Sequence, residues 1–144
     1  IRADMDGGAV TWGELYTIQP FNNYLITMDL TGRQIYDLLN QQWHNPPYPR
    51  VLQISGLSYT WDSTMPQDDC IVEVRDINGD PIDLTATYSV TVNNFIATGG
   101  DNFTVLLDGT NQVTGPIDLD VLIDYLESIQ QPFFAEIEGR IERL

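Results

Sequence analysis

The sequence predicts an α+β fold: a single compact domain with mixed β-sheets and two main helices. Runs rich in Val, Ile, Thr and Tyr fill the middle third of the chain, and clusters of Gly, Pro and Asp separate them, as turns separate strands. Two other segments place apolar residues at helical spacing. The 144 residues suffice for one domain, and an apolar content of 42% argues against disorder.

A change of period predicts the first strand and the first main helix. Residues 24–30 alternate their side chains as a strand does, after a short extended or helical lead-in at 9–21. From Thr31, a suitable N-cap, to about Trp43 the pattern is helical, and the prolines of "HNPPYPR" then require a loop because proline lacks an amide donor. The inward face of this helix is expected to carry Ile35, Leu38, Leu39 and Gln42.

The middle of the chain is expected to be β-structure. Asn78-Gly79 lies between apolar runs and is the strongest short signal for a hairpin turn. The runs that share a strand-like composition are residues 51–56, 57–63, 70–76, 87–94 and 104–109.

The second main helix is expected near the end of the chain. Asp118 is a candidate cap, and Pro132 stops the helical pattern. Residues 133–144 are expected to be extended or coil. The apolar positions on one face of this helix are Leu119, Leu122, Ile123, Leu126 and Ile129.

The charge of the chain limits its partners. Acidic residues number 21 against 6 basic ones, all Arg, which gives a net charge of −15 at pH 7. Nucleic-acid binding is disfavoured, because it relies on clustered basic side chains. The acids are expected to form a solvated surface, or a few isolated Arg serve a specific anionic ligand. No stretch reaches the roughly 18 apolar residues of a membrane span.

The residues that usually carry catalysis are scarce. Cys70 and His44 are each the only residue of their kind, so neither a disulfide nor a multi-His metal cluster is expected, and His44 is predicted to be a solvated loop residue. Most acids fall in turns, where they usually act as caps. The run "DINGDPID" resembles a calcium loop, but its Gly comes early and the final Glu is missing.

The run "FIATGGD", Phe95 to Asp101, predicts a binding loop. Paired glycines let backbone approach a ligand, but an acid follows Gly99 and Gly100 where a phosphate site would place a base. Asp101 therefore suits hydroxyl or amino donors. Phe95 here and Phe21 in "PFNN" could stack a flat heterocycle, or each could plug the edge of the core.

Four motifs together resemble the C-terminal domain of the secreted 5′-nucleotidases, a group that includes UDP-sugar hydrolases and 2′,3′-cyclic-nucleotide phosphodiesterases. They are "IRAD…GGAVTWGELYTIQPFNNYLITMDLTGRQI", "LQISGLSYTWD", "YSVTVNNFIATGGDNF" and "EGRI", and they run from Ile1 to about Ile141. The resemblance implies that residues 1–144 are a substrate-binding domain. It also implies a covalently linked N-terminal metallophosphatase domain, with two divalent metal ions, that lies outside this chain.

The resemblance also implies the roles of individual residues. Phe21 and Phe95 match the rings that sandwich the base, and Asn23 matches a residue that hydrogen-bonds it. Asp101 matches the acid that holds the ribose hydroxyls. The remaining matches are Arg2, a phosphate-directed Arg, and Gly99 and Gly100, the turn that lets the acid approach.

One departure concerns Asn22, which stands where the family usually has Gly; Asn is the residue that best replaces Gly if that position needs a positive φ. The chain supplies no two-metal site, so we expect it to bind and select a nucleotide without cofactor of its own, and to be inactive when isolated. The family's habit of export predicts a secreted, periplasmic or cell-surface location in a bacterium. The alternative is a non-enzymatic cell-surface binding or adhesion domain on the same fold.

Overall fold

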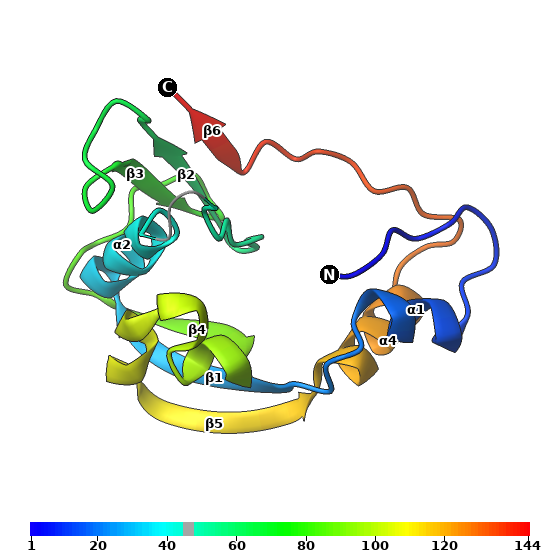
Figure 1. Cartoon of the computed structure of the whole chain (residues 1–144). Coiled ribbons are helices and arrows are strands. Elements are labelled where there is room, and N and C mark those ends of the chain that lie inside the picture. Colours follow the sequence, from blue (N-terminus) through cyan, green and yellow to red (C-terminus); the bar gives the residue numbers. More distant parts are fainter. Residues whose placement is uncertain (45–47) are drawn as a thin grey trace.

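The computed structural model describes residues 1–44 and 48–144 (Figure 1). Its first sheet is antiparallel, with strand order β4–β1–β5. The central strand β1 covers Tyr24–Thr31, and its neighbours are β4, Thr87–Asn93, and β5, Thr110–Ile117. The expected strands at 24–30 and 87–94 are thus confirmed.

The second sheet has strand order β3–β2–β6. β2, Leu57–Trp61, pairs antiparallel with β3, Ile71–Asp76, and parallel with the short β6, Ile141–Arg143. The first two strands confirm the predictions for 57–63 and 70–76. β6 lies within the tail that was expected to be extended or coil.

The helix α2, Gly32–Gln41, begins where the sequence predicts and ends two residues before Trp43. Thr31 caps it, because its side chain accepts a hydrogen bond from the Gln34 amide while the Gln34 side chain accepts one from the Thr31 amide. The predicted inward positions Ile35, Leu38 and Leu39 are buried, and so is Gln42, which follows the last helical residue. His44 is exposed as predicted, whereas residues 45–47 of the expected loop lie outside the described residues.

The other helices are α1, Trp12–Ile18, within the lead-in, the one-turn α3, Asn94–Ala97, and α4, Asp118–Ser128. Two 3₁₀ turns follow α3: η1, Gly100–Asn102, and η2, Thr104–Asp108. Figure 1 shows the first sheet linking two parts, with α2 and the second sheet at one end and α1 with α4 at the other. Within the described residues, every helix is too short or too polar to span a lipid bilayer.

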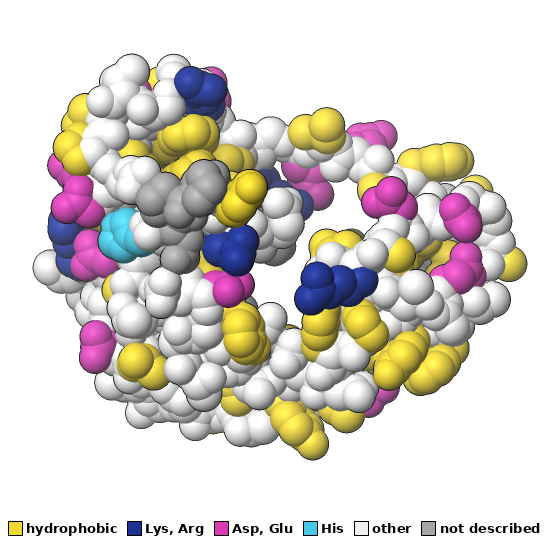
Figure 2. Space-filling view, in the orientation of Figure 1, with side chains coloured by type: hydrophobic (Ala, Val, Ile, Leu, Met, Phe, Trp, Pro, Cys, Tyr) yellow, Lys and Arg dark blue, Asp and Glu magenta, His cyan; other side chains and the backbone are white. Residues whose placement is uncertain are grey.

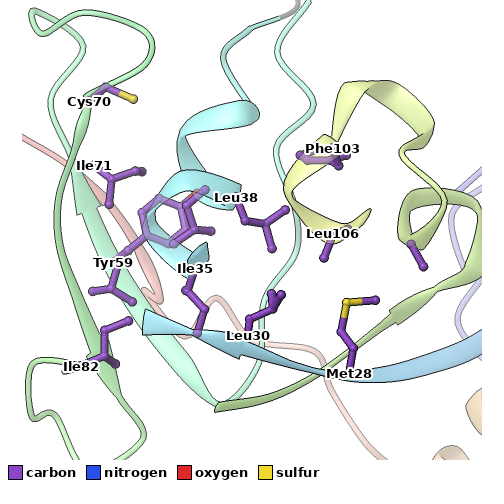
Figure 3. Close-up of a cluster of buried hydrophobic side chains, with 13 residues drawn as sticks. Met28, Leu30, Ile35, Leu38, Tyr59, Cys70, Ile71, Ile82, Phe103 and Leu106 are labelled. Carbon is purple, nitrogen blue, oxygen red and sulfur yellow. The ribbon is translucent and has the colours of Figure 1, made fainter. Parts of the chain in front are cut away.

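Two separate clusters of buried side chains form the core. The main cluster joins α2, both sheets and η2, and its most enclosed members include Met28, Leu30 and Leu106 (Figure 3). The smaller cluster, between α1 and α4, contains the buried residues Leu15, Ile18 and Leu119.

Two predicted strands are wrong. Residues 51–56 form no strand, because Gln42 takes the backbone amides of Arg50 and Leu52. Residues 104–108 form η2 instead, and its 3₁₀ geometry places the buried Leu106 three residues after the buried Phe103 that precedes the turn.

The strand β5 was not predicted, because its run "TNQVTGPI" is polar and contains Gly115 and Pro116. Most of its side chains are exposed, so backbone pairing with β1 defines this strand rather than apolar burial. Pro116 is tolerated because β5 is an edge strand.

Two turn and cap predictions need adjustment. Asp118 is not the cap of α4: Ile117 occupies that position, and Asp118 is the first helical residue. The turn at Asn78-Gly79 is confirmed, with the Gly79 amide donating to the Asp76 carbonyl at 3.0 Å and a φ of +86° at Gly79. Its returning arm makes a single bridge, between Arg75 and Pro81, rather than a strand.

Candidate functional site

Three loops meet at one end of the first sheet. Since β1 and β4 are antiparallel and Leu25 pairs with Asn93, the loop before β1 and the turn after β4 lie at the same end. The Tyr24 amide donates to Oδ1 of Asn94 at 2.8 Å, which ties these two segments together. The Asp118 amide donates to the Asn23 carbonyl at 2.8 Å and adds the start of α4. The predicted residues of the 21–23 and 95–101 loops are thereby brought to one region.

Phe21 lies between α1 and β1, and the residue is 43% exposed. The guanidinium carbon of Arg2 lies 5.1 Å from the centre of this ring, in cation–π geometry. The Arg2 amide donates to the Ile18 carbonyl at 2.9 Å, so the end of α1 fixes the backbone of Arg2. Asn22 has a φ of 50°, the left-handed conformation for which Asn is the best replacement of Gly.

Phe95 lies on α3, which Asn93 caps, because the Asn93 side chain accepts a hydrogen bond from the Ile96 amide at 3.0 Å. The residue is 49% exposed, and its ring lies against the backbone of Gly100. A Cβ at Gly100 would lie 2.5 Å from the Phe95 carbonyl oxygen and 2.8 Å from Cζ of the ring. Only glycine allows the ring to lie so close. Gly99 follows α3 with a φ of 84°, which reverses the chain.

Asp101 follows this turn in a left-handed conformation, with φ 52° and ψ 26°. A non-glycine residue in this region is uncommon and marks a position that its surroundings hold in place. Oδ2 of its carboxylate lies 3.4 Å from Nε of Arg50, and both side chains are partly exposed. The acid of the binding loop is therefore paired with a base from the segment between α2 and β2.

Sequence reasoning missed Arg50 and Asn94. Arg50 carries a weak signal, since it is one of only six basic residues in a chain of net charge −15. Asn94 offers none, because the second Asn of "VNNF" cannot be distinguished from an ordinary helix start without knowing that Tyr24 lies beside it.

Cys70 and the turn acid Asp76 make hydrogen bonds that support the local fold. Cys70 is buried, its amide donates to Oδ1 of Asn40 at 2.9 Å, and burial raises the pKa of its thiol, which disfavours the reactive thiolate. In the turn that resembles a calcium loop, Oδ1 of Asp76 accepts hydrogen bonds from the Asn78 and Asp80 amides at 2.8 and 3.0 Å. Those bonds, first that of Asp80, lower the pKa of Asp76.

A two-metal phosphatase centre does not fit the residues of this chain. Such a centre needs clustered His, Asp or Glu ligands. Among residues 1–44 and 48–144 no three such side chains, or Cys, are grouped so that they could hold a metal ion.

The surface around the site is open. Figure 2 shows an opening between the two parts of the molecule, with basic side chains on both sides of it. An apolar groove of about 1010 Å³ lies elsewhere, between the N-terminal segment and α4, and its lining includes Trp12, Leu15, Leu126 and Phe134. We regard the sheet end as the better candidate site, because the two loops that are tied together there carry partly exposed aromatic and acidic side chains, and basic side chains lie against them.

The fold and this loop pattern agree with a family assignment. The family model described as "5'-nucleotidase, C-terminal domain" matches residues 1–108. The chain belongs to this family.

Individual relatives extend the match over the whole chain. A solved 5'-nucleotidase precursor from Thermus thermophilus superposes with a TM-score of 0.90 at 43% identity and covers 100% of this chain. The endonuclease YhcR of Bacillus subtilis is 38% identical over 99% of this chain, and a cell wall protein of Listeria monocytogenes is 34% identical over 91%. This chain spans 30% of the Thermus protein, 12% of YhcR and 17% of the Listeria protein.

Proposed function

We propose that this chain is the nucleotide-recognition domain of a 5′-nucleotidase-type phosphohydrolase and binds the nucleoside part of the substrate at the sheet end. The observation that carries the proposal is that a glycine turn places the half-exposed Phe95 beside Asp101, at the same sheet end as the loop that carries the half-exposed Phe21, in a member of this family. A flat base needs ring faces and a ribose needs hydrogen-bond acceptors, and these groups supply both.

The base stacks on Phe21 and Phe95. Their exposure of 43% and 49% supports this role over that of core plugs, which would be enclosed. Because Arg2 already covers one face of Phe21, the base takes the other face, and Arg2 stays close enough to be directed at a phosphate. Stacking of bases on aromatic side chains contributes about 1–3 kcal/mol per base in single-strand binders, which is the scale we expect.

The polar groups of the site bind the sugar and the edge of the base. Asp101 accepts hydrogen bonds from the ribose hydroxyls, and its carboxylate makes these bonds charge-assisted. Asn23, whose backbone is fixed by the Asp118 amide, contacts the edge of the base. Gly99 and Gly100 let the backbone approach the ligand.

Hydrolysis belongs to a covalently linked N-terminal metallophosphatase domain that carries two divalent metal ions. This chain then selects the nucleotide, and alone it binds with millimolar or weaker affinity because the phosphate contacts are shared with the other domain. We place the whole protein outside the cytoplasm, at the periplasm, cell wall or surface of a bacterium, in line with a relative that is called a cell wall protein.

The test is a titration of the 144-residue chain with AMP, followed by amide shifts in NMR. We expect residues of the 21–23 and 95–101 loops to shift at millimolar AMP, and Phe95→Ala to weaken binding by about tenfold, the equivalent of about 1.4 kcal/mol of stacking. Phe134→Ala is the matched control, because Phe134 is 83% exposed and lies outside these loops. Shifts confined to another patch would overturn the site.

A second measurement addresses where the chemistry takes place. The isolated chain is incubated with AMP and a divalent metal salt, and released phosphate is measured. We expect no release above background, and sustained turnover by the chain alone would contradict the division of labour.

The second candidate is a non-enzymatic cell-surface binding or adhesion module, which the cell wall relative favours. The two candidates differ in what the gene encodes before Ile1. A metallophosphatase-like region with Asp-x-His and Asn-His-Glu/Asp motifs supports the hydrolase, and a gene without such a region supports the adhesion module.

A further inference from the structure

We propose that Arg50 is the positioning residue for Asp101 and that it sets the preference of the site for ribose over 2′-deoxyribose. This inference rests on the proposed function. It begins with the ion pair, in which Nε of Arg50 lies 3.4 Å from Oδ2 of Asp101. By engaging Oδ2, Arg50 restricts rotation of the carboxylate and fixes the direction in which its oxygens accept hydrogen bonds.

The backbone that carries Arg50 is anchored independently of its side chain. Gln42 is fully buried, and its carbonyl accepts from the Arg50 amide at 2.9 Å. Its side-chain Oε1 accepts from the Leu52 amide at 2.6 Å. The side-chain amide is itself held, since Nε2 donates to the Leu39 carbonyl at 2.8 Å and to the Tyr59 hydroxyl at 3.2 Å. One buried Gln thus fixes the segment on both sides of residue 51.

The loop that carries Asp101 is anchored by the neighbouring residue, Gln41. Its Nε2 donates to the Thr104 hydroxyl at 2.8 Å, and its Oε1 accepts from the Val105 amide at 3.2 Å. Phe103, between this anchor and Asp101, is buried in the main core. Adjacent side chains at the end of α2 therefore hold the two segments that meet in the ion pair.

This arrangement matches a positioned acceptor rather than a stabilising surface bridge. A half-exposed ion pair contributes little to the stability of the fold. The hydrogen bonds of Gln41 and Gln42 therefore do not serve to form a stabilising ion pair. They do place a base beside the one acid that the proposed function directs at the sugar. Arg50 also offsets the negative charge of Asp101, which would otherwise repel an anionic nucleotide from a chain of net charge −15.

The experiment compares AMP with 2′-deoxy-AMP in NMR titrations of the 144-residue chain. The unaltered chain is expected to prefer AMP by about tenfold, the scale of one hydrogen bond to a charged group. Arg50→Gln should reduce this preference to about twofold, because the carboxylate loses the charged contact that Arg50 makes with its Oδ2. Arg50→Lys keeps a donor and the charge and should restore part of the preference.

Arg33→Gln is the matched control, because Arg33 pairs with Asp37 at 3.2 Å on the exposed side of α2 and loses the same charge. It should leave the preference unchanged. Thermal midpoints of all variants are measured to verify that each is folded.

The outcomes separate the two proposals. If neither nucleotide shifts the 21–23 and 95–101 loops of the unaltered chain, the proposed function fails. If the unaltered chain binds AMP but does not discriminate, the Asp101 contact and the role of Arg50 both fail. If it discriminates and Arg50→Gln keeps the preference or binds AMP more tightly, the role of Arg50 alone is overturned.

Discussion

The two hydrophobic clusters differ greatly in extent, and the candidate site lies between them. The main cluster packs both sheets against α2 and η2 and has many enclosed side chains, such as Met28 and Leu106. The small cluster joins only α1 and α4 through Leu15, Ile18 and Leu119. Phe95 and Asp101 belong to the side of the main cluster, whereas Phe21 and Arg2 follow or contact α1.

We call Phe95 and Asp101 the Phe95 wall of the site, and Phe21 and Arg2 the α1 wall. The difference between the clusters indicates that these two walls do not have equal stability. Regions with few buried apolar contacts open at lower free energy than the global transition. The α1 wall therefore depends on a small cluster, and its distance from the Phe95 wall can change without unfolding the sheets. Four predictions test this comparison, from the largest expected effect to the smallest.

Leu106→Ala should have the largest effect on stability. The side chain is fully buried in the main cluster, and truncating a buried Leu typically costs about 2–5 kcal/mol. Both walls should be lost together, because the sheets unfold as a unit. Urea unfolding followed by tryptophan fluorescence measures the change; a change below about 1 kcal/mol would show that this region repacks freely.

Leu119→Ala should have a smaller and local effect. Leu119 is buried between α1 and α4 in the small cluster. We expect about 2–3 kcal/mol, at the low end for such truncations, because few buried neighbours surround it. Hydrogen exchange should accelerate in α1 and α4 while the protection of β1 and β4 is retained. Equal acceleration in both regions would mean that the clusters unfold together.

Gly100→Ala tests the Phe95 wall alone. The added Cβ would meet the Phe95 carbonyl and ring, so the ring must move, with an expected loss of about 1–2 kcal/mol in stability, in the lower part of the range for overpacked sites. AMP binding should weaken together with stability. Gly79→Ala is the control, because Gly79 has a φ of +86° with open space around it and lies in the turn after β3. It should reduce stability but leave AMP binding intact.

The smallest expected effect is the loss of stability at low pH, to which Asp76 contributes in the region of the main cluster. Asp76, in the turn after β3, has a pKa lowered from 3.8 chiefly by the hydrogen bond from the Asp80 amide. A lowered folded pKa contributes stability that is complete above pH 3.8 and is lost as the pH falls through the folded value. Asp76→Asn should therefore flatten the loss of stability below about pH 4, measured by thermal melts. An unchanged acid limb would contradict this contribution.

Much of the fold follows from local patterns. The alternation of 24–30 predicts β1 because one face must be buried, and Thr31 predicts the start of α2 because an N-cap side chain satisfies an end amide. The same reasoning failed at 51–56 and 104–109. There the side chains of Gln42 and Gln41 bind backbone amides that a strand would have paired with another strand, and no local pattern reveals such distant partners.

The candidate site divides in the same way. The sequence by itself indicated the candidate binding loop, because a glycine pair lets the backbone approach a ligand and Phe95 and Asp101 lie directly beside that pair in the chain. Only the tertiary structure decided that Arg2 covers Phe21 and that Arg50 pairs with Asp101. Residues 50 and 101 are far apart along the chain, and their meeting depends on how α2 packs and on the amides that its last residues bind.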